Sequence, residues 1–96
     1  MLRFLALLLV LVACVDRPAV DASGEEIYAQ LCSRCHGDAL QGVLGPGLGE
    51  GSPTASQPDE FIRVTVMHGK GRMPSMEGVL TDEQLEGLIA YIRGQQ

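Results

Sequence analysis

The clearest pattern of apolar and polar positions in this 96-residue chain lies near its C-terminal end. From Leu85 to Ile92 the apolar residues recur at i, i+3, i+4 and i+7, the spacing of a helix that buries one face. The segment Thr81–Gln84 just before them has the form of a capping box, in which a threonine and a glutamine satisfy the first free backbone amides of a helix. We therefore predict an amphipathic helix over this region.

Two further helices are predicted from their start and stop signals. The segment Ser23–Glu26 is also a capping box, and its acidic residues suit the positive end of a helix dipole. A first helix is therefore expected from about Gly24 to Cys35. The segment Pro58–Glu60 supplies the proline and the acidic first turn of a second helix, which Gly69 should end.

The stretches between these helices are predicted to be loops. Residues 37–58 and 69–78 are rich in glycine, proline and serine, which break any regular period. The chain shows no alternating strand pattern and no internal repeat. The fold class expected is therefore all-α, with three to four short helices and long irregular loops. Such loops are uncommon in a compact domain unless they pack on a ligand.

The N-terminal residues have the features of a secretion signal. One basic residue, Arg3, is followed by an apolar run from Phe4 to Val12. This run is too short to cross roughly 30 Å of hydrocarbon as a helix, which favours a removable leader over a permanent membrane span.

A cysteine follows the apolar run in a setting that suggests a lipid anchor. The segment Leu11–Cys14 resembles the bacterial lipobox, in which the cysteine is acylated and becomes the new N-terminus. We expect a signal peptide over residues 1–13, a tether over residues 14–22 that starts at a lipidated Cys14, and a folded domain over residues 23–96. The protein would then be exported and held at the periplasmic or extracytoplasmic face of a membrane.

Composition adds two constraints to this picture. The chain has no Trp, two Tyr and two Phe, so it offers few of the bulky side chains that usually fill a small core. A domain of this size needs a staple or a large buried ligand to be stable. The net charge of −5 argues against binding of nucleic acid and favours redox partners that are basic where they touch this protein.

The strongest chemical signal is the segment Cys32-Ser33-Arg34-Cys35-His36, which is the pattern for covalent attachment of c-type haem. On a helix with about 100° per residue, the two cysteines and the histidine point to one side. Two thiols can then reach the two vinyl groups of one porphyrin while the imidazole reaches the iron. This motif would supply the staple, the buried ligand and one axial iron ligand together, with one haem per chain.

Other uses of the two cysteines are weaker hypotheses. A disulfide or a thioredoxin-like redox pair would be expected in a βαβ context, which the sequence lacks. A zinc site would have to recruit a further ligand from Cys14 or His68, at a spacing unlike that of known zinc motifs.

The agreement extends along the chain, and from Ser23 to Arg93 the sequence resembles the class I cytochrome c family. Gly24 and Tyr28 lie before the haem motif where the family has a glycine and an aromatic residue, and Tyr91 matches the aromatic of its last helix. The resemblance implies the cytochrome c fold around one covalent haem. It also implies that Gly24 allows the two terminal helices to cross closely.

The resemblance also implies the surroundings of the iron. Gly45-Pro46 with Leu48 is similar to the family's loop in which the proline carbonyl accepts a hydrogen bond from the iron-bound imidazole of His36. Met73-Pro74 is similar to the loop that supplies the sixth ligand. The expected axial ligands are therefore His36 and Met73.

The window around Met73 contains other possible ligands. Met67 and His68 fall at the end of a predicted helix, where Met67 is expected to pack in the core and His68 to lie near the negative end of the helix dipole. Met76 is expected to be a loop residue, since Glu77 beside it would be costly near a buried iron. Ligation by His68 would give a bis-histidine haem of lower potential.

With both axial positions occupied, the iron would have no open site for oxygen or a substrate. We therefore expect a one-electron carrier and not an enzyme, with no small-molecule substrate, that meets its redox partners through the exposed haem edge. Two alternatives stay open. One is an electron-accepting subunit of a larger dehydrogenase or oxidase complex, and the other is a haem-based gas sensor.

Overall fold

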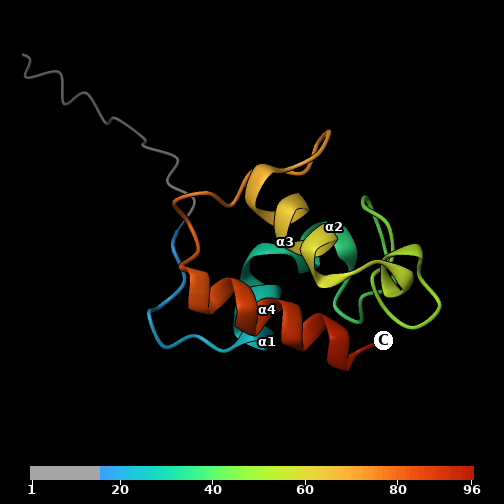
Figure 1. Cartoon of the computed structure of the whole chain (residues 1–96), viewed down its shortest axis with the longest axis horizontal. Coiled ribbons are helices and arrows are strands. Elements are labelled where there is room, and N and C mark those ends of the chain that lie inside the picture. Colours follow the sequence, from blue (N-terminus) through green and yellow to red (C-terminus); the bar gives the residue numbers. More distant parts are fainter. Residues whose placement is uncertain (1–15) are drawn as a thin grey trace, which may run out of the picture.

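The computed structural model describes residues 16–96, so the predicted signal peptide and the lipidation site at Cys14 lie outside the described residues. Over that part the chain is helical and forms no strand, which confirms the predicted all-α class. None of the helices within residues 16–96 is both long and apolar enough to cross a membrane. In chain order the elements are α1 (Gly24–Leu31), α2 (Ser33–His36), the 3-10 helix η1 (Pro53–Ser56), α3 (Asp59–His68) and α4 (Asp82–Gly94) (Figure 1).

The first and last helices cross at a pair of glycines. Gly24 begins α1, and a β-carbon added there would lie 2.1 Å from the carbonyl oxygen of Gly87 in α4. Next to this crossing the rings of Tyr28 and Tyr91 pack at 5.5 Å between centroids with a tilt of 49°. The close crossing expected at Gly24 is therefore confirmed. It holds α1, and with it the cysteine motif at its end, firmly against α4 (Figure 1).

The helix starts agree with the capping signals, but the first helix is interrupted. Ser23 and Thr81 each cap a helix in a complete capping box, as predicted. The single helix expected from Gly24 to Cys35 is wrong in one respect, because Cys32 has φ −116° and separates α1 from α2. Hydrogen bonds to the carbonyl of Cys32 restart the helix, which then ends at His36.

Within the segment expected to be a tether, residues 16–22 contact the domain. Pro18 is buried, and the carbonyl of Ala19 accepts a hydrogen bond of 2.9 Å from the buried side chain of Gln84. The side chain of Gln30 donates to the carbonyl of Asp16 at 2.9 Å. These contacts are invisible in the sequence because they join residues up to 65 positions apart.

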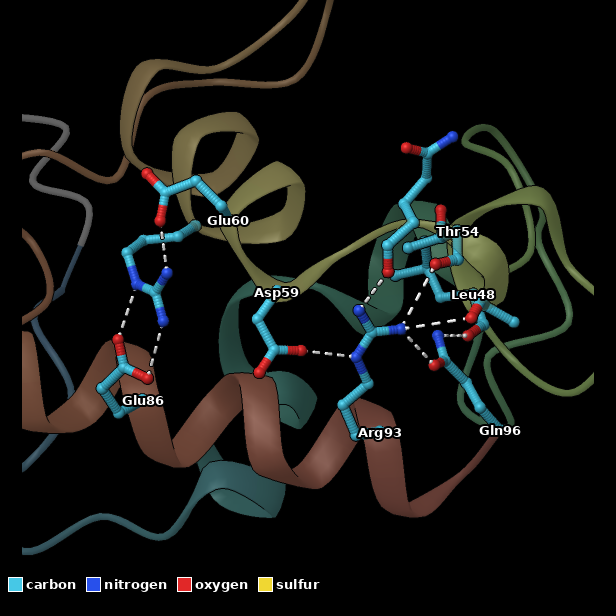
Figure 2. Close-up of polar contacts among 10 residues, drawn as sticks. Leu48, Thr54, Asp59, Glu60, Glu86, Arg93 and Gln96 are labelled. Carbon is cyan, nitrogen blue, oxygen red and sulfur yellow. Dashed lines mark hydrogen bonds and ion pairs between the residues drawn. The ribbon is translucent and has the colours of Figure 1, made fainter.

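The core lies between α1, α4 and α3 and extends into the loop after α3. Arg63 of α3 pairs with Glu86 of α4 and with Glu60, and this contact ties α3 to α4 at the surface (Figure 2). The hydrogen bond from Arg63 holds the pKa of Glu86 below its usual range. The buried apolar residues are Ile27, Tyr28, Leu40, Ile62, Val66, Met76, Leu80, Leu85, Leu88, Ile89 and Ile92.

Arg93 near the end of α4 fastens the long loop that contains η1 (Figure 2). Its guanidinium pairs with Asp59 at 2.7 Å and donates to the carbonyls of Thr54, Ala55 and Gln57. The sequence predicted only loop between residues 37 and 58. The short η1 turn forms because Pro53 suits the first turn of a helix and Arg93 satisfies the carbonyls at its end.

Candidate functional site

A cavity of about 440 Å³ opens between α2, α3, α4 and the loops that follow α2 and α3. This volume falls within the about 300–1,000 Å³ that is usual for cofactor sites. Among residues 16–96, no aspartate or glutamate lines it. The lining includes two methionines, two prolines and the aliphatic and aromatic side chains of Leu31, Leu44, Leu48, Phe61, Ile62, Val66, Leu80, Leu88 and Ile92.

The structure brings the two cysteines and the histidine of the predicted haem motif to this one cavity. Cys32 is half-buried and Cys35 is exposed, and the two do not form a disulfide. Burial, and to a lesser extent the nearby Cys35, raises the pKa of the Cys32 thiol to about 11. A thioredoxin-like pair needs a lowered thiol pKa, so this shift is in the wrong direction for that alternative.

His36 is buried and its ring is held by one hydrogen bond. Its Nδ1 lies 2.8 Å from the carbonyl oxygen of Pro46, which has no proton to give, so Nδ1 is the donor. The neutral ring then has an unprotonated Nε2, whose lone pair is available to a metal ion. The bond expected from the family resemblance is therefore present in the protein.

The loop that contains Pro46 wraps around the end of α2. The amides of Val43 and Gly45 donate to the carbonyl of Cys35 at 3.2 and 2.8 Å. Gly45 lies directly on the imidazole, because a β-carbon there would come within 3.0 Å of Cε1 of His36. A larger residue at this position would push the loop, and the carbonyl of Pro46, away from the ring.

Tyr28 also fixes the end of α2. Its hydroxyl is buried and donates a hydrogen bond of 2.6 Å to the carbonyl of Gly37, the residue that ends α2. Burial is the main reason why the pKa of Tyr28 rises to about 12. α2 is thus held by α1, by the loop over residues 42–46 and by its own backbone turn.

Met73 reaches the cavity from a tight turn after α3. The amides and carbonyls of Lys70 and Met73 bond to each other at 3.1 and 2.9 Å. Gly69 and Gly71 adopt positive φ angles of 75° and 58°, which the turn requires. Met73 is half-buried and lines the cavity.

The other candidates for a sixth ligand differ in their placement. His68 is exposed at the end of α3, and neither it nor the half-buried Met67 lines the cavity. Met76 lies in the loop, as expected, but its side chain is only 5% exposed and lines the cavity. The amide of Met76 donates to the carbonyl of Val66 at 3.0 Å, which draws this part of the loop into the core.

These residues fit a covalent haem c. Two thiols and an imidazole with a free nitrogen lie at one apolar cavity, and thioether side chains reach it from a separate loop. Among residues 16–96, no three His, Cys, Asp or Glu side chains group as a metal site, so they offer no support for zinc.

Sequence reasoning missed Leu44, Phe61, Lys70 and Arg72, which also line the cavity and follow no pattern that links them along the chain.

Comparisons with known proteins find c-type cytochromes. A family model described as cytochrome C oxidase, cbb3-type, subunit III matches residues 19–92. Cytochrome c-551 of Bacillus subtilis is 39% identical over 75 residues, which cover 77% of this chain and 62% of that protein. Cytochrome c6 of Leptolyngbya boryana is 31% identical over 74 residues, or 74% of this chain and 87% of that one.

The fold is also similar to that of solved structures. The KustC0563 c-type cytochrome matches with a TM-score of 0.70 and 26% identity over 78% of this chain and 99% of its own, which confirms the predicted fold. This chain spans 62% of cytochrome c-551 and 42%, 28% and 19% of three longer curated relatives. It therefore corresponds to one module of those longer proteins.

Proposed function

This chain belongs to the class I c-type cytochrome family, whose cofactor is covalently bound haem c, and from that premise we propose that it is a one-electron carrier with His36 and Met73 as axial ligands. The observation that best supports this is the hydrogen bond of 2.8 Å from His36 to Pro46 at an apolar cavity shared with both cysteines. It leaves the second ring nitrogen free for iron.

In this proposal Cys32 and Cys35 hold the haem through two thioether bonds and Pro46 orients the imidazole of His36. The bound haem supplies a single iron that alternates between the ferric and the ferrous state. The protein excludes water with its apolar lining and keeps the ligand ring in one orientation. Met73 completes the coordination from a turn that its two glycines and its own backbone bonds stabilise.

The lining of the cavity favours electron transfer over substrate chemistry. General acid–base catalysis needs a titratable side chain near the reacting bond. Among the described residues, the titratable side chains in the lining are His36, which is assigned to the iron, Cys32 and Cys35, which are assigned to the haem, and the exposed Lys70, while no carboxylate lines the cavity. This arrangement supports a carrier that exchanges electrons with other proteins through the exposed edge of the haem.

Paired variants test the ligand assignment. Met73→Ala should abolish the weak far-red absorption of methionine-ligated ferric haem and open the ferrous form to carbon monoxide. Met76→Ala is the matched control, because Met76 lines the same cavity but is held to α3 through its amide. Loss of the far-red band in the Met76 variant and not in the Met73 variant would reverse the assignment.

Export and lipidation at Cys14 are part of the proposal, with residues 1–13 as a signal peptide. Because one acyl chain is a marginal anchor, more than one chain is expected on the mature N-terminus. The intact mass of the membrane fraction distinguishes the forms. A mature chain that starts after Cys14, or one that retains Met1, would contradict lipidation.

The second candidate function is that of an electron-accepting subunit in a larger complex. This function is favoured by the length of three relatives, of which this chain spans less than half. A module of this kind therefore also occurs within larger proteins. Purification from the native membrane distinguishes the free carrier from the fixed subunit. A carrier should elute alone, whereas a fixed subunit should elute with a large partner in constant ratio.

A further inference from the structure

The loop after α3 returns to the end of that helix and caps it. The last carbonyls of a helix have no partner within the helix and need one from elsewhere. The amide of Met76 donates to the carbonyl of Val66 at 3.0 Å, and the hydroxyl of Ser75 donates to the carbonyl of Met67 at 2.5 Å. Both carbonyls belong to the last turn of α3. The segment that contains Met73 is therefore closed into a loop whose two ends meet at α3.

Ser75 is the side-chain part of this closure. Among the side chains of residues 69–78, only that of Ser75 forms a hydrogen bond with α3. Its oxygen also accepts a hydrogen bond of 3.1 Å from the amide of Glu77, which fixes the direction of the hydroxyl. Ser75 is exposed, so its replacement by alanine removes this bond without opening a void in the core.

Met73 follows the position of Ser75 closely. Only Pro74 separates the two residues, and a proline has a fixed φ angle. Their backbone also lies against Gly69, the residue that ends α3. A β-carbon at Gly69 would lie 2.5 Å from the carbonyl oxygen of Met73 and 2.8 Å from the amide nitrogen of Ser75. A movement of Ser75 away from α3 would therefore displace Met73 as well.

We propose that Ser75 is a positioning residue for Met73, and that its bond to the carbonyl of Met67 controls how often the sixth ligand leaves the iron. This inference rests on the proposed ligation of the haem iron by Met73 and deepens it. A ligand that is already held in its bound position loses less entropy when it binds. Without the hydroxyl, the amide of Met76 is the remaining hydrogen bond from residues 74–78 to α3.

Displacement of Met73 by imidazole in the ferric holoprotein measures this opening. An external ligand binds only when the sixth position is free, so its apparent affinity is proportional to the open fraction. Because one hydrogen bond changes an equilibrium constant by up to about tenfold, Ser75→Ala should raise the apparent affinity for imidazole about three- to tenfold. Loss of the far-red band follows the titration. Ser75→Thr keeps the hydroxyl at an exposed position with room for the added methyl group, and it should retain the original affinity.

Ser56→Ala is the matched control for the loss of a surface hydrogen bond. Ser56 is also exposed, and its hydroxyl donates to the carbonyl of Pro53 at 2.9 Å. Neither of these two residues lines the cavity. Both alanine variants should lose similar, small amounts of stability in urea unfolding. Only Ser75→Ala should bind imidazole more tightly in the ferric form and carbon monoxide faster in the ferrous form, which a merely structural role of Ser75 would not produce.

Two results would overturn the proposal. One is an imidazole affinity of Ser75→Ala equal to that of the unaltered protein. The other is an equal rise in affinity in Ser56→Ala or in Ser75→Thr. Absence of the far-red band from the unaltered ferric protein would refute ligation by Met73, and the role of Ser75 with it. A normal band with an unchanged affinity in Ser75→Ala would refute the role of Ser75 alone, so the two failures are distinguishable.

Discussion

Substitution of Gly24 by alanine should destabilise the protein through the crossing of α1 and α4. The added β-carbon would lie 2.1 Å from the carbonyl oxygen of Gly87 and 2.7 Å from its carbonyl carbon. Both are backbone atoms inside a helix and cannot rotate away as a side chain would. The helices must therefore separate, and the packing of Tyr28 on Tyr91 beside the crossing is disturbed.

The size of the effect follows from this geometry. Overpacking of a well-filled interior typically costs about 1–3 kcal/mol, and a contact against rigid backbone should lie in the upper part of that range. Gly24 is the first residue of α1, so alanine gains little from its higher helix propensity there. For a domain of this size each kcal/mol lowers the melting temperature by about 4–8 °C.

Gly87→Ala is the control, because it places the same methyl group on the other side of the same crossing. Its nearest neighbour would be the amide nitrogen of Gly24 at 4.0 Å, an ordinary contact. In the interior of α4 the change from glycine to alanine should leave the free energy of unfolding unchanged or raise it by up to about 1 kcal/mol. Denaturant unfolding of the holoprotein, followed by circular dichroism, measures the change in stability of both variants. A Gly24→Ala protein as stable as the original, or a Gly87→Ala protein that loses as much stability as Gly24→Ala, would show that the crossing does not depend on the missing side chain of Gly24.

Three further predictions concern individual hydrogen bonds. Tyr28→Phe leaves the carbonyl of Gly37 without its donor and should cost about 1–3 kcal/mol in urea unfolding. Because the pKa of Tyr28 is raised from 10.0 to about 12 in the folded protein, its contribution should be complete below pH 10 and decline as the pH rises towards 12, a dependence that the phenylalanine variant should lack. Gln84→Glu keeps the side-chain oxygen that caps α4 but loses the amide that donates to the carbonyl of Ala19. Amide hydrogen exchange should therefore accelerate in residues 16–22 while α4 stays protected. Unchanged exchange in residues 16–22 would contradict this prediction. Arg93→Lys keeps the charge but loses the fork that binds three loop carbonyls, so it should recover less than half of the stability lost in Arg93→Gln in thermal unfolding.

The parts of the fold that the sequence predicted are governed by local rules. The caps at Ser23 and Thr81 and the end of α3 at Gly69 depend on residues within one helical turn, and all three are confirmed. The grouping of Cys32, Cys35 and His36 at one cavity follows from helix geometry over five residues. Such features need no knowledge of tertiary contacts.

The parts that were missed depend on residues distant in the sequence. Met76 is buried because its amide bonds to α3, which no pattern around residue 76 reveals. The attachment of residues 16–22 depends on Gln84, whose predicted role was only to cap α4. Lys70 and Arg72 line the cavity because a turn after α3 brings them there, while no carboxylate among residues 16–96 lines it, an arrangement that the total charge conceals.

A coulometric redox titration of the purified holoprotein, followed by its visible spectrum, tests directly whether the protein is a one-electron carrier. A carrier with His36 and Met73 as ligands should hold one haem per chain and show a single transition in which each chain takes up one electron, with the far-red methionine band present in the ferric form. Absence of electron uptake by haem-containing protein, or more than one transition, would contradict this role.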